Sequence, residues 1–242
     1  MIRMKKLSVL IPAYNEEKTI CTVLDKVISV RLLDDIKKEI IVINDCSRDS
    51  SEEKILDYIK THPDNCIQYV KHEINQGKGA AIHSGISMAS GDYIIIQDAD
   101  LECDPIEFNL LLKPMYEGYA DVVFGSRFAG GNTHRVLRKR NLNANKFLTW
   151  LTNLFTGLTI TDMETCYKLF KADIIKKIHL TEKRFGFEPE VTIKIARIPK
   201  IKLYEISISY YARGIDEGKK IGWKDGIRAV YCILKYGLFR AK

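Results

Sequence analysis

Three acidic residues at every second position follow one short apolar run. The run is Tyr93–Ile96, and the acidic residues are Asp98, Asp100 and Glu102. If the segment stays extended, alternation points all three carboxylates to one side, where they repel one another unless a cation lies between them. Such oxygen ligands suit Mg²⁺ or Mn²⁺, whose coordination a diphosphate would help to complete. The spacing therefore predicts a metal site, with a solvated acidic loop as the alternative.

Polar residues also follow two earlier apolar runs. The first run ends in Pro12-Ala-Tyr14-Asn-Glu16, and the second ends in Asn44-Asp45. Tyr14 can stack on a base, and the Asp45 carboxylate can accept hydrogen bonds from a base or a ribose. An ordinary turn explains the proline and the asparagines but not Tyr14 and Glu16. The two motifs are compatible with a nucleotide site, and the simple turn remains open for each.

The elements that must position these residues have the pattern of an α/β fold. Ser50 and Glu53 form a capping box, and Asp104-Pro105-x-Glu107 places a cap, a first-turn proline and an N3 carboxylate in order. Strands rich in Ile and Val that alternate with helices predict a mostly parallel central sheet flanked by helices. In such sheets ligands bind beyond the carboxyl ends of the strands, where the polar motifs fall. Five apolar runs have the length of buried strands, at Leu7–Ile11, Glu39–Ile43, Ile67–Val70, Tyr93–Ile96 and Asp121–Phe124.

The second half of the chain is less regular. We expect helices over Leu142–Thr156, Pro189–Arg197 and Trp223–Phe239, with further elements around Cys166–Phe170 and Lys202–Ile208. No internal repeat or long linker divides the 242 residues. The sequence therefore predicts one domain over residues 1–242.

The composition narrows the class of protein. Six cysteines without a C-x-x-C pair and a start without a secretory signal indicate reduced thiols in a cytoplasmic protein. No apolar stretch reaches the roughly 18 to 20 residues of a membrane-spanning helix, so any membrane contact is expected to be peripheral.

Charge is divided unevenly along the chain. Residues 1–120 carry 14 Lys+Arg against 20 Asp+Glu, a net −6, and residues 121–242 carry 24 against 11, a net +13. An acidic half suits a metal ion, whereas a basic half suits phosphates, nucleic acid or an anionic membrane. A solvated basic face is the alternative.

Two expected helices carry apolar stripes beside basic residues. The first stripe is Phe147, Leu151, Leu154, Phe155 and Leu158, after Arg135, Arg138, Lys139 and Arg140; the second is Ile227, Val230, Tyr231, Leu234 and Leu238. This pattern favours a protein lying on an anionic membrane. Packing on the sheet or a homodimer contact would produce the same stripes.

The motifs in chain order resemble a known family. Pro12-Ala-Tyr-Asn-Glu, Asn44-Asp45, Asn75-x-Gly77-Lys78-Gly79, Asp98-Ala-Asp100 and Gly125-Ser-Arg127 are similar to those of family-2 glycosyltransferases of the GT-A fold. Within that family the chain looks most like the dolichol-phosphate mannose synthases and bacterial polyprenyl-phosphate hexosyltransferases. The later Arg213 and Lys219, six residues apart, also match this subgroup, so the resemblance covers nearly the whole chain.

The resemblance implies roles for individual residues. Pro12, Tyr14, Glu16, Ile43 and Asp45 would hold the nucleoside, Asp98, Ala99 and Asp100 would surround the diphosphate, and Lys78, Arg127, Arg213 and Lys219 would also bind the donor. Asp98, Asp100 and Glu102 would hold Mg²⁺ or Mn²⁺, although the position of Glu102 is often Gln in the subgroup. Arg127, Arg138 and Arg140 would meet the acceptor phosphate. Residues 1–125 would then be the nucleotide-sugar and metal half, and residues 126–242 the acceptor half.

The implied reaction is inverting transfer of a hexose from a GDP- or UDP-sugar to a polyprenyl phosphate, dolichyl or undecaprenyl, on the cytoplasmic face of a membrane. A phosphate acceptor is already anionic and requires no general base. A hydroxyl acceptor on a cell-envelope glycan or glycolipid would require one, and Asp162 or Glu164 is the candidate. The expected catalytic set is Asp98, Asp100, Arg127 and Asp162.

Two other classes of protein fit the sequence motifs less well. A sugar-nucleotide synthase would be expected to carry a Gly-rich, Arg-containing phosphate loop where this chain has Pro12–Glu17. A nucleic-acid-binding module would leave the Asp98–Glu102 cluster without a role, so we expect no nucleic acid partner.

Overall fold

The computed structural model describes residues 4–133, 135–136, 139–212 and 223–239. Three of the expected phosphate-binding residues, Arg138, Arg213 and Lys219, lie outside the described residues.

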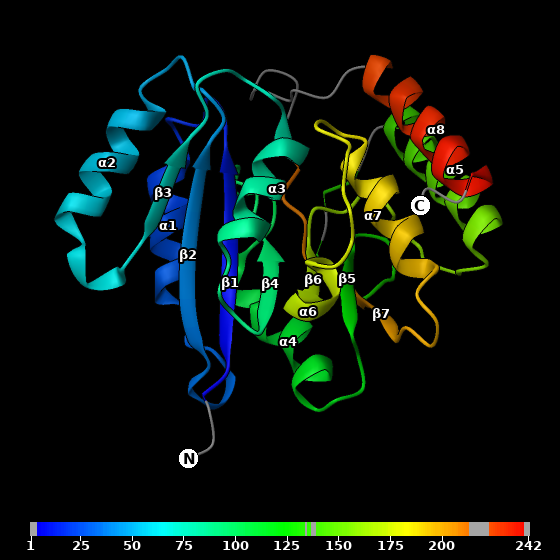
Figure 1. The fold of residues 1–242 in the computed structure, drawn as a ribbon, viewed down its shortest axis with the longest axis horizontal. Helices are drawn as coiled ribbons and strands as arrows, with labels where there is room; N and C mark the ends of the chain where they lie inside the picture. The colour runs from blue at the N-terminus through cyan, green and yellow to red at the C-terminus, as the bar shows by residue number, and fades with distance from the viewer. Residues whose placement is uncertain (1–3, 134, 137–138, 213–222, 240–242) are drawn as a thin grey trace.

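A seven-stranded sheet runs through the molecule in the order β3-β2-β1-β4-β6-β5-β7 (Figure 1). Strand β6 is antiparallel to β4 and β5, and the other pairs are parallel, so the prediction of a mostly parallel sheet is confirmed. All five strands expected in the first half are present. The strands are β1 (Lys6–Ala13), β2 (Lys37–Asn44), β3 (Gln68–Lys71), β4 (Tyr93–Ile96), β5 (Val122–Ser126), β6 (Lys168–Lys171) and β7 (Leu203–Ser207).

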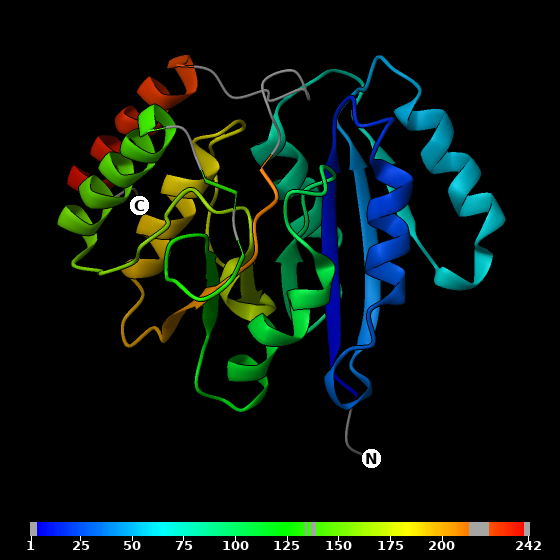
Figure 2. The same cartoon turned by 180° about the vertical axis from the view of Figure 1, so that it is seen from behind.

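The central strands are apolar on both faces because helices cover both sides of the sheet. Along β1, Leu7, Val9 and Ile11 enter one hydrophobic cluster, whereas Leu10 enters the cluster on the opposite face. Helices α1 (Ile20–Ser29) and α4 (Phe108–Tyr116) cover the first face (Figure 2), and α3 (Lys78–Met88) and α7 (Phe187–Ala196) cover the second. Fully burying such an aliphatic side chain is worth about 1.5–3 kcal/mol, so this alternation fixes the register of the strands.

The remaining helices lie around this core. Helix α2 (Ser51–Thr61) packs on α1, and α5 (Lys139–Thr156) and α8 (Trp223–Leu238) pack on each other and on α7 at one end of the molecule (Figure 1). A short helix, α6 (Ala172–Ile175), follows β6, and single 3₁₀ turns lie at Leu33–Asp35, Pro63–Asn65 and Pro105–Glu107.

The two predicted helix starts differ in outcome. Asp104 caps the turn at Pro105 by accepting a hydrogen bond from the backbone N–H of Ile106, as expected. Ser50 occupies the cap position of α2 but makes no side-chain cap bond, so the predicted capping box is wrong. Ser51 instead turns inward, where its hydroxyl accepts a hydrogen bond from the backbone N–H of Glu16 and helps to join two loops at the strand ends.

The apolar stripe of α8 is largely on the surface, whereas the stripe of α5 is divided, because Leu151, Phe155 and Leu158 pack against the core. Along α5, Phe147 and Leu154 are exposed, whereas the polar Asn145, Thr149 and Thr152 are buried. Along α8, the buried side chains are Ala229, Cys232, Ile233 and Tyr236, and the exposed ones are Ile227, Tyr231, Leu234 and Leu238. No helix in the described part of the chain is both long and apolar enough to span a bilayer.

Candidate functional site

A cavity of about 370 Å³ lies at the carboxyl ends of the strands. It opens where the chain reverses direction across the sheet, between β1 and β4, which is where ligands bind in open α/β sheets. Segments that follow six of the seven strands reach it. Its lining comprises Pro12, Ala13, Tyr14, Glu16, Asp45, Asn75, Gly77, Lys78, Ala81, Asp98, Ala99, Asp100, Glu102, Arg127, Glu164, Cys166, Arg184, Phe185, Glu188 and Tyr210.

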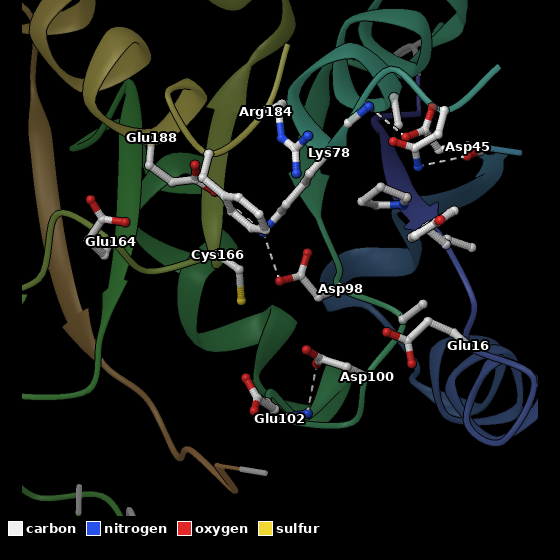
Figure 3. A pocket seen from close by; sticks show the side chains of 18 of the residues that line it. Glu16, Asp45, Lys78, Asp98, Asp100, Glu102, Glu164, Cys166, Arg184 and Glu188 are labelled. Atoms are coloured by element: carbon white, nitrogen blue, oxygen red, sulfur yellow. Dashed lines mark hydrogen bonds and ion pairs between the residues drawn. The ribbon is translucent and has the colours of Figure 1, made fainter. Parts of the chain in front are cut away.

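The loop after β4 brings Asp98, Asp100 and Glu102 to one wall of this cavity (Figure 3). The segment is not extended as the alternation argument assumed, because Leu101 has a left-handed backbone with φ of 63° and Asp100 accepts the Glu102 N–H at 3.1 Å. The Glu102 carboxylate accepts a hydrogen bond of 2.6 Å from the Tyr210 hydroxyl. The three carboxylates therefore border the same cavity, but from a turn and not from an extended segment. Within the described ranges, no three Asp, Glu, His or Cys side chains form a ready-made metal cluster.

The carboxylate of Asp45, which directly follows β2, contacts three neighbouring residues. Its carboxylate accepts hydrogen bonds from the backbone N–H groups of Gln76 and Gly77, at 2.9 and 2.7 Å. His72 contacts the same carboxylate through Nδ1 at 2.7 Å, and its Nε2 lies 2.9 Å from the Ser84 hydroxyl. Asp45 thus fixes the turn that leads into α3 and still borders the cavity.

Lys78, the first residue of α3, links two walls of the cavity. Its ammonium group lies 2.8 Å from Asp98 and 3.3 Å from Glu188 at the start of α7 (Figure 3). Burial alone would lower the pKa of Lys78, but the two carboxylates outweigh it and hold the pKa well above its usual range. Lys78 therefore carries its charge, which both acidic neighbours compensate.

Arg127 and Asp162 form a buried bidentate pair. Arg127 donates Nε and Nη2 hydrogen bonds of 2.6 and 2.7 Å to the two oxygens of Asp162, and its backbone N–H donates a third bond at 3.0 Å. The Asn145 amide supplies a fourth donor. Burial would raise the pKa of Asp162, but the Arg127 charge and hydrogen bonds prevail and lower it. Asp162 is completely buried and is not among the residues that line the cavity, so the catalytic role expected for it stays a prediction that its contact with Arg127 would have to mediate.

Glu164, two residues further, does border the cavity. Its Oε1 atom is buried and has no hydrogen-bond partner among the described residues. Burial, followed by the nearby Glu188, raises the pKa of Glu164 to about 8. The buried Lys168 holds the segment in place, since its ammonium group donates to the backbone carbonyls of Met163 and Thr165.

The glycines of the Gly77-Lys78-Gly79 motif meet a segment from the second half of the chain. A Cβ atom on Gly79 would lie 2.3 Å from the Glu182 carbonyl oxygen, and one on Gly77 would lie 2.6 Å from that of Lys183. The Ala80 N–H donates to the same Lys183 carbonyl at 2.9 Å. The motif thus permits a close approach of two backbones, and its partner is the residue 182–184 segment.

Most of the site residues expected from the sequence border one cavity, and three described ones, Asp162, Ile43 and Arg140, do not. Ile43 is fully buried and packs on Gly85 of α3, so its side chain points into the core. Arg140 is exposed in the first turn of α5, away from the lining. The lining also contains residues to which the sequence gave no role, among them Asn75, Cys166, Arg184, Phe185, Glu188 and Tyr210. Only their position beside the cavity distinguishes them, although Asn75 stood within a recognised motif.

The comparisons with known proteins agree with this arrangement. Residues 8–179 match the family described as "Glycosyl transferase family 2". The chain is 30% identical over 96% of its length to a dolichyl-phosphate beta-glucosyltransferase of Trichomonas vaginalis, 73% of which is covered. It is also 30% identical over 90% of its length to an undecaprenyl-phosphate 4-deoxy-4-formamido-L-arabinose transferase of Photorhabdus laumondii, 63% of which is covered.

A solved structure shares the fold. Glucosyl-3-phosphoglycerate synthase from Mycobacterium tuberculosis, crystallised with Mn²⁺, uridine diphosphate and phosphoglyceric acid, superposes with a TM-score of 0.75 at 18% identity. The match covers 98% of this chain and 80% of that one. With a seven-stranded GT-A sheet, a lined cavity at its switch point and a family match over most of the sequence, the chain belongs to glycosyltransferase family 2.

Proposed function

We propose that this enzyme transfers a hexose from a UDP- or GDP-sugar to a polyprenyl phosphate, with inversion at the anomeric carbon. The observation that carries the proposal is the single cavity that gathers Tyr14, Asp45 and the Asp98–Glu102 segment with Arg127. The names of the relatives, transferases acting on dolichyl or undecaprenyl phosphate, support this acceptor class.

In this proposal Tyr14 stacks on the base, and Asp45 holds the turn that closes the nucleoside site. Lys78 stands where it can meet the donor diphosphate beside Asp98. Asp98, Asp100 and Glu102 supply carboxylate oxygens on one wall, the donor set that Mg²⁺ or Mn²⁺ prefers once diphosphate oxygens complete it. When bound, the metal would neutralise the charge that develops on the departing nucleoside diphosphate.

The acceptor phosphate needs no base, because its second pKa is about 6 and it is anionic near neutral pH. One of its oxygens forms the new bond to the anomeric carbon as the bond from that carbon to the diphosphate breaks. Asp162 then acts only through Arg127, by holding the guanidinium group at the cavity wall.

The outer faces of α5 and α8 support peripheral attachment to a membrane, for which we propose the cytoplasmic face. Phe147 and Trp150 are 50% and 57% exposed, with ring centroids 6.0 Å apart, and Leu154 is 63% exposed. Exposed aromatic and aliphatic groups on a helix that begins with Lys139 and Arg140 suit an anionic lipid surface. A dimer contact through the same faces is the competing arrangement.

One observation favours a second candidate, transfer to a hydroxyl of a glycan or glycolipid. Glu164 borders the cavity, its Oε1 atom has no hydrogen-bond partner among the described residues, and its pKa raised to about 8 makes its deprotonated carboxylate a stronger general base for a hydroxyl. This role would be tested by the acceptor that the enzyme selects.

The deciding experiment measures nucleotide release from UDP- and GDP-sugars with Mg²⁺ or Mn²⁺, with and without a short prenyl phosphate. Release that depends on the prenyl phosphate is expected, together with loss of transfer in D100A and in the presence of EDTA. Donor binding without lipid-dependent release would shift the acceptor to a hydroxyl. An active, metal-independent D100A enzyme would refute the metal assignment.

A further inference from the structure

The cavity is strongly acidic, and this creates a problem for an anionic acceptor. Among the residues that the structure describes, seven carboxylate side chains and three cationic ones line it, the cations being Lys78, Arg127 and Arg184. A phosphate that enters such a space is repelled unless a positive charge faces it. Which of the three cations can serve depends on what each already binds.

Two of the three cations are already paired. The Lys78 ammonium group lies between Asp98 and Glu188, and the Arg127 guanidinium group is bidentate to the buried Asp162. An ion pair of this kind cancels most of the field that either charge projects into the cavity. Lys78 is thus committed to the place beside Asp98 where the donor diphosphate is proposed to bind, and Arg127 cannot turn to a second anion without leaving the buried Asp162 uncompensated.

Arg184 is the exception. No carboxylate or other hydrogen-bond acceptor in the described part of the chain pairs with its guanidinium group, and its side chain borders the cavity. Figure 3 shows Arg184 on the side of the cavity that also holds Lys78 and Glu188, across from Asp100 and Glu102. It therefore offers a full charge and its N–H donors on the wall that faces the acidic loop.

The backbone around Arg184 is held in place by features that the mechanism above does not otherwise use. The residue 182–184 segment lies on Gly77 and Gly79, and the aliphatic part of Arg184 comes within 2.7 Å of the position that a Gly77 Cβ would occupy. The Ala80 N–H anchors the preceding carbonyl, that of Lys183. The segment thus has a built position, and the Gly-x-Gly motif is what admits it.

We propose that Arg184 binds the phosphate of the acceptor, across the cavity from Asp100 and Glu102. Arginine presents a planar fork of N–H donors that matches phosphate oxygens, and such charge-assisted hydrogen bonds are among the stronger ones in proteins. The inference rests on the proposed acceptor class. In this inference Arg184, and not Arg127, is the main contact to that phosphate, because Asp162 already neutralises the charge of Arg127.

The test compares R184M, R184K and the matched control K183M, using a soluble ten-carbon prenyl phosphate and UDP or GDP as separate probes. Methionine retains the aliphatic stem that packs on Gly77, and Lys183 is an exposed cation next in sequence whose side chain does not line the cavity. We expect R184M to lower kcat/KM for the prenyl phosphate about 10- to 100-fold, as the loss of a charge-assisted contact predicts. R184K should recover part of this loss, and K183M should stay within about threefold of wild type because the Lys183 side chain is exposed and does not line the cavity. Nucleotide affinity, measured by calorimetry, should stay within about twofold in all three variants.

Three results would overturn the assignment. One is an unchanged kcat/KM in R184M, and another is an equal loss in K183M, which would indicate only a long-range effect of charge. The third is a tenfold loss of nucleotide affinity with normal use of the acceptor, which would place Arg184 on the donor. Direct binding of the prenyl phosphate to the nucleotide-loaded protein separates this inference from the proposed function. Wild-type binding without transfer would refute the function and still test Arg184, whereas no wild-type binding would refute both.

Discussion

Replacing Asp162 with asparagine removes the negative charge that compensates Arg127. Asp162 is completely buried and accepts hydrogen bonds from three N–H groups of Arg127 and from the Asn145 amide. The side chain of Arg127 is only 13% exposed, so water cannot take over this role. Breaking a buried ion pair by removing one partner costs about 3–5 kcal/mol.

That free energy translates into a measurable melting shift. For a domain of this size each kcal/mol corresponds to about 2–4 °C, so D162N should melt roughly 6–20 °C below wild type in differential scanning calorimetry. The pKa of Asp162 is lowered in the folded protein, so its contribution is fully present above its unfolded pKa, near 3.9, and is lost as the pH falls through the lower folded pKa. The experiment is therefore run at pH 7.

A surface pair supplies the matched control. Arg31 and Asp35 also form an ion pair, but their side chains are 89% and 78% exposed, so D35N should change the melting temperature by no more than about 2 °C. The double variant R127M/D162L should recover much of the stability lost in D162N, because apolar groups of similar volume replace a buried pair at little cost.

The single variant D162N also distinguishes two roles for Asp162, positioning Arg127 or acting as a base. A positioning role predicts that D162N loses stability and transfer together, for every acceptor. If D162N melted within 2 °C of wild type and lost only transfer to a hydroxyl acceptor, the reasoning from the Arg127 pair would be refuted and the residue would be a base.

Two further predictions concern a buried acid and the outer helices. Because the folded pKa of Glu164 is raised to about 8, wild type should lose stability as the pH rises through the interval between about 4.3 and 8, by at most about 1.4 kcal/mol per pH unit. E164Q lacks this loss, so its melting temperature relative to wild type should rise between pH 5 and pH 8, and a constant difference would contradict the raised pKa. The double variant F147S/W150S should reduce co-sedimentation with anionic vesicles at least tenfold, while L110S, which alters a 49% exposed leucine of α4, should not. Equal sedimentation of all three proteins would exclude the α5 face as the membrane contact, and a changed oligomeric state would indicate a dimer contact instead.

The sequence by itself determined the sheet and one half of the cavity. Apolar runs such as Tyr93–Ile96, which alternate with helical patterns, predict buried parallel strands, and the polar residues after such strands lie at one edge of the sheet. For this reason Tyr14, Asp45, Asp98 and Asp100 were predicted together and lie together. Local spacing was less reliable, since a left-handed Leu101 turned the acidic segment that alternation had treated as extended.

Only the tertiary structure decided which charged side chains are able to bind a ligand in the cavity. Asp162 and Glu164 are two residues apart and both carry a carboxylate. Asp162 pairs with Arg127 and does not line the cavity, whereas Glu164 does line it. Lys78 and Arg184 are both cations of the cavity, yet the carboxylates that neutralise Lys78 come from elements about 20 and 110 residues away in the sequence. Pairing of this kind depends on distances of a few ångströms between distant segments, because the Coulomb energy and the desolvation of each group are set by their surroundings in the folded chain. The residue types show which chemistry is possible, and the packing of the second half against the first shows which groups can carry it out.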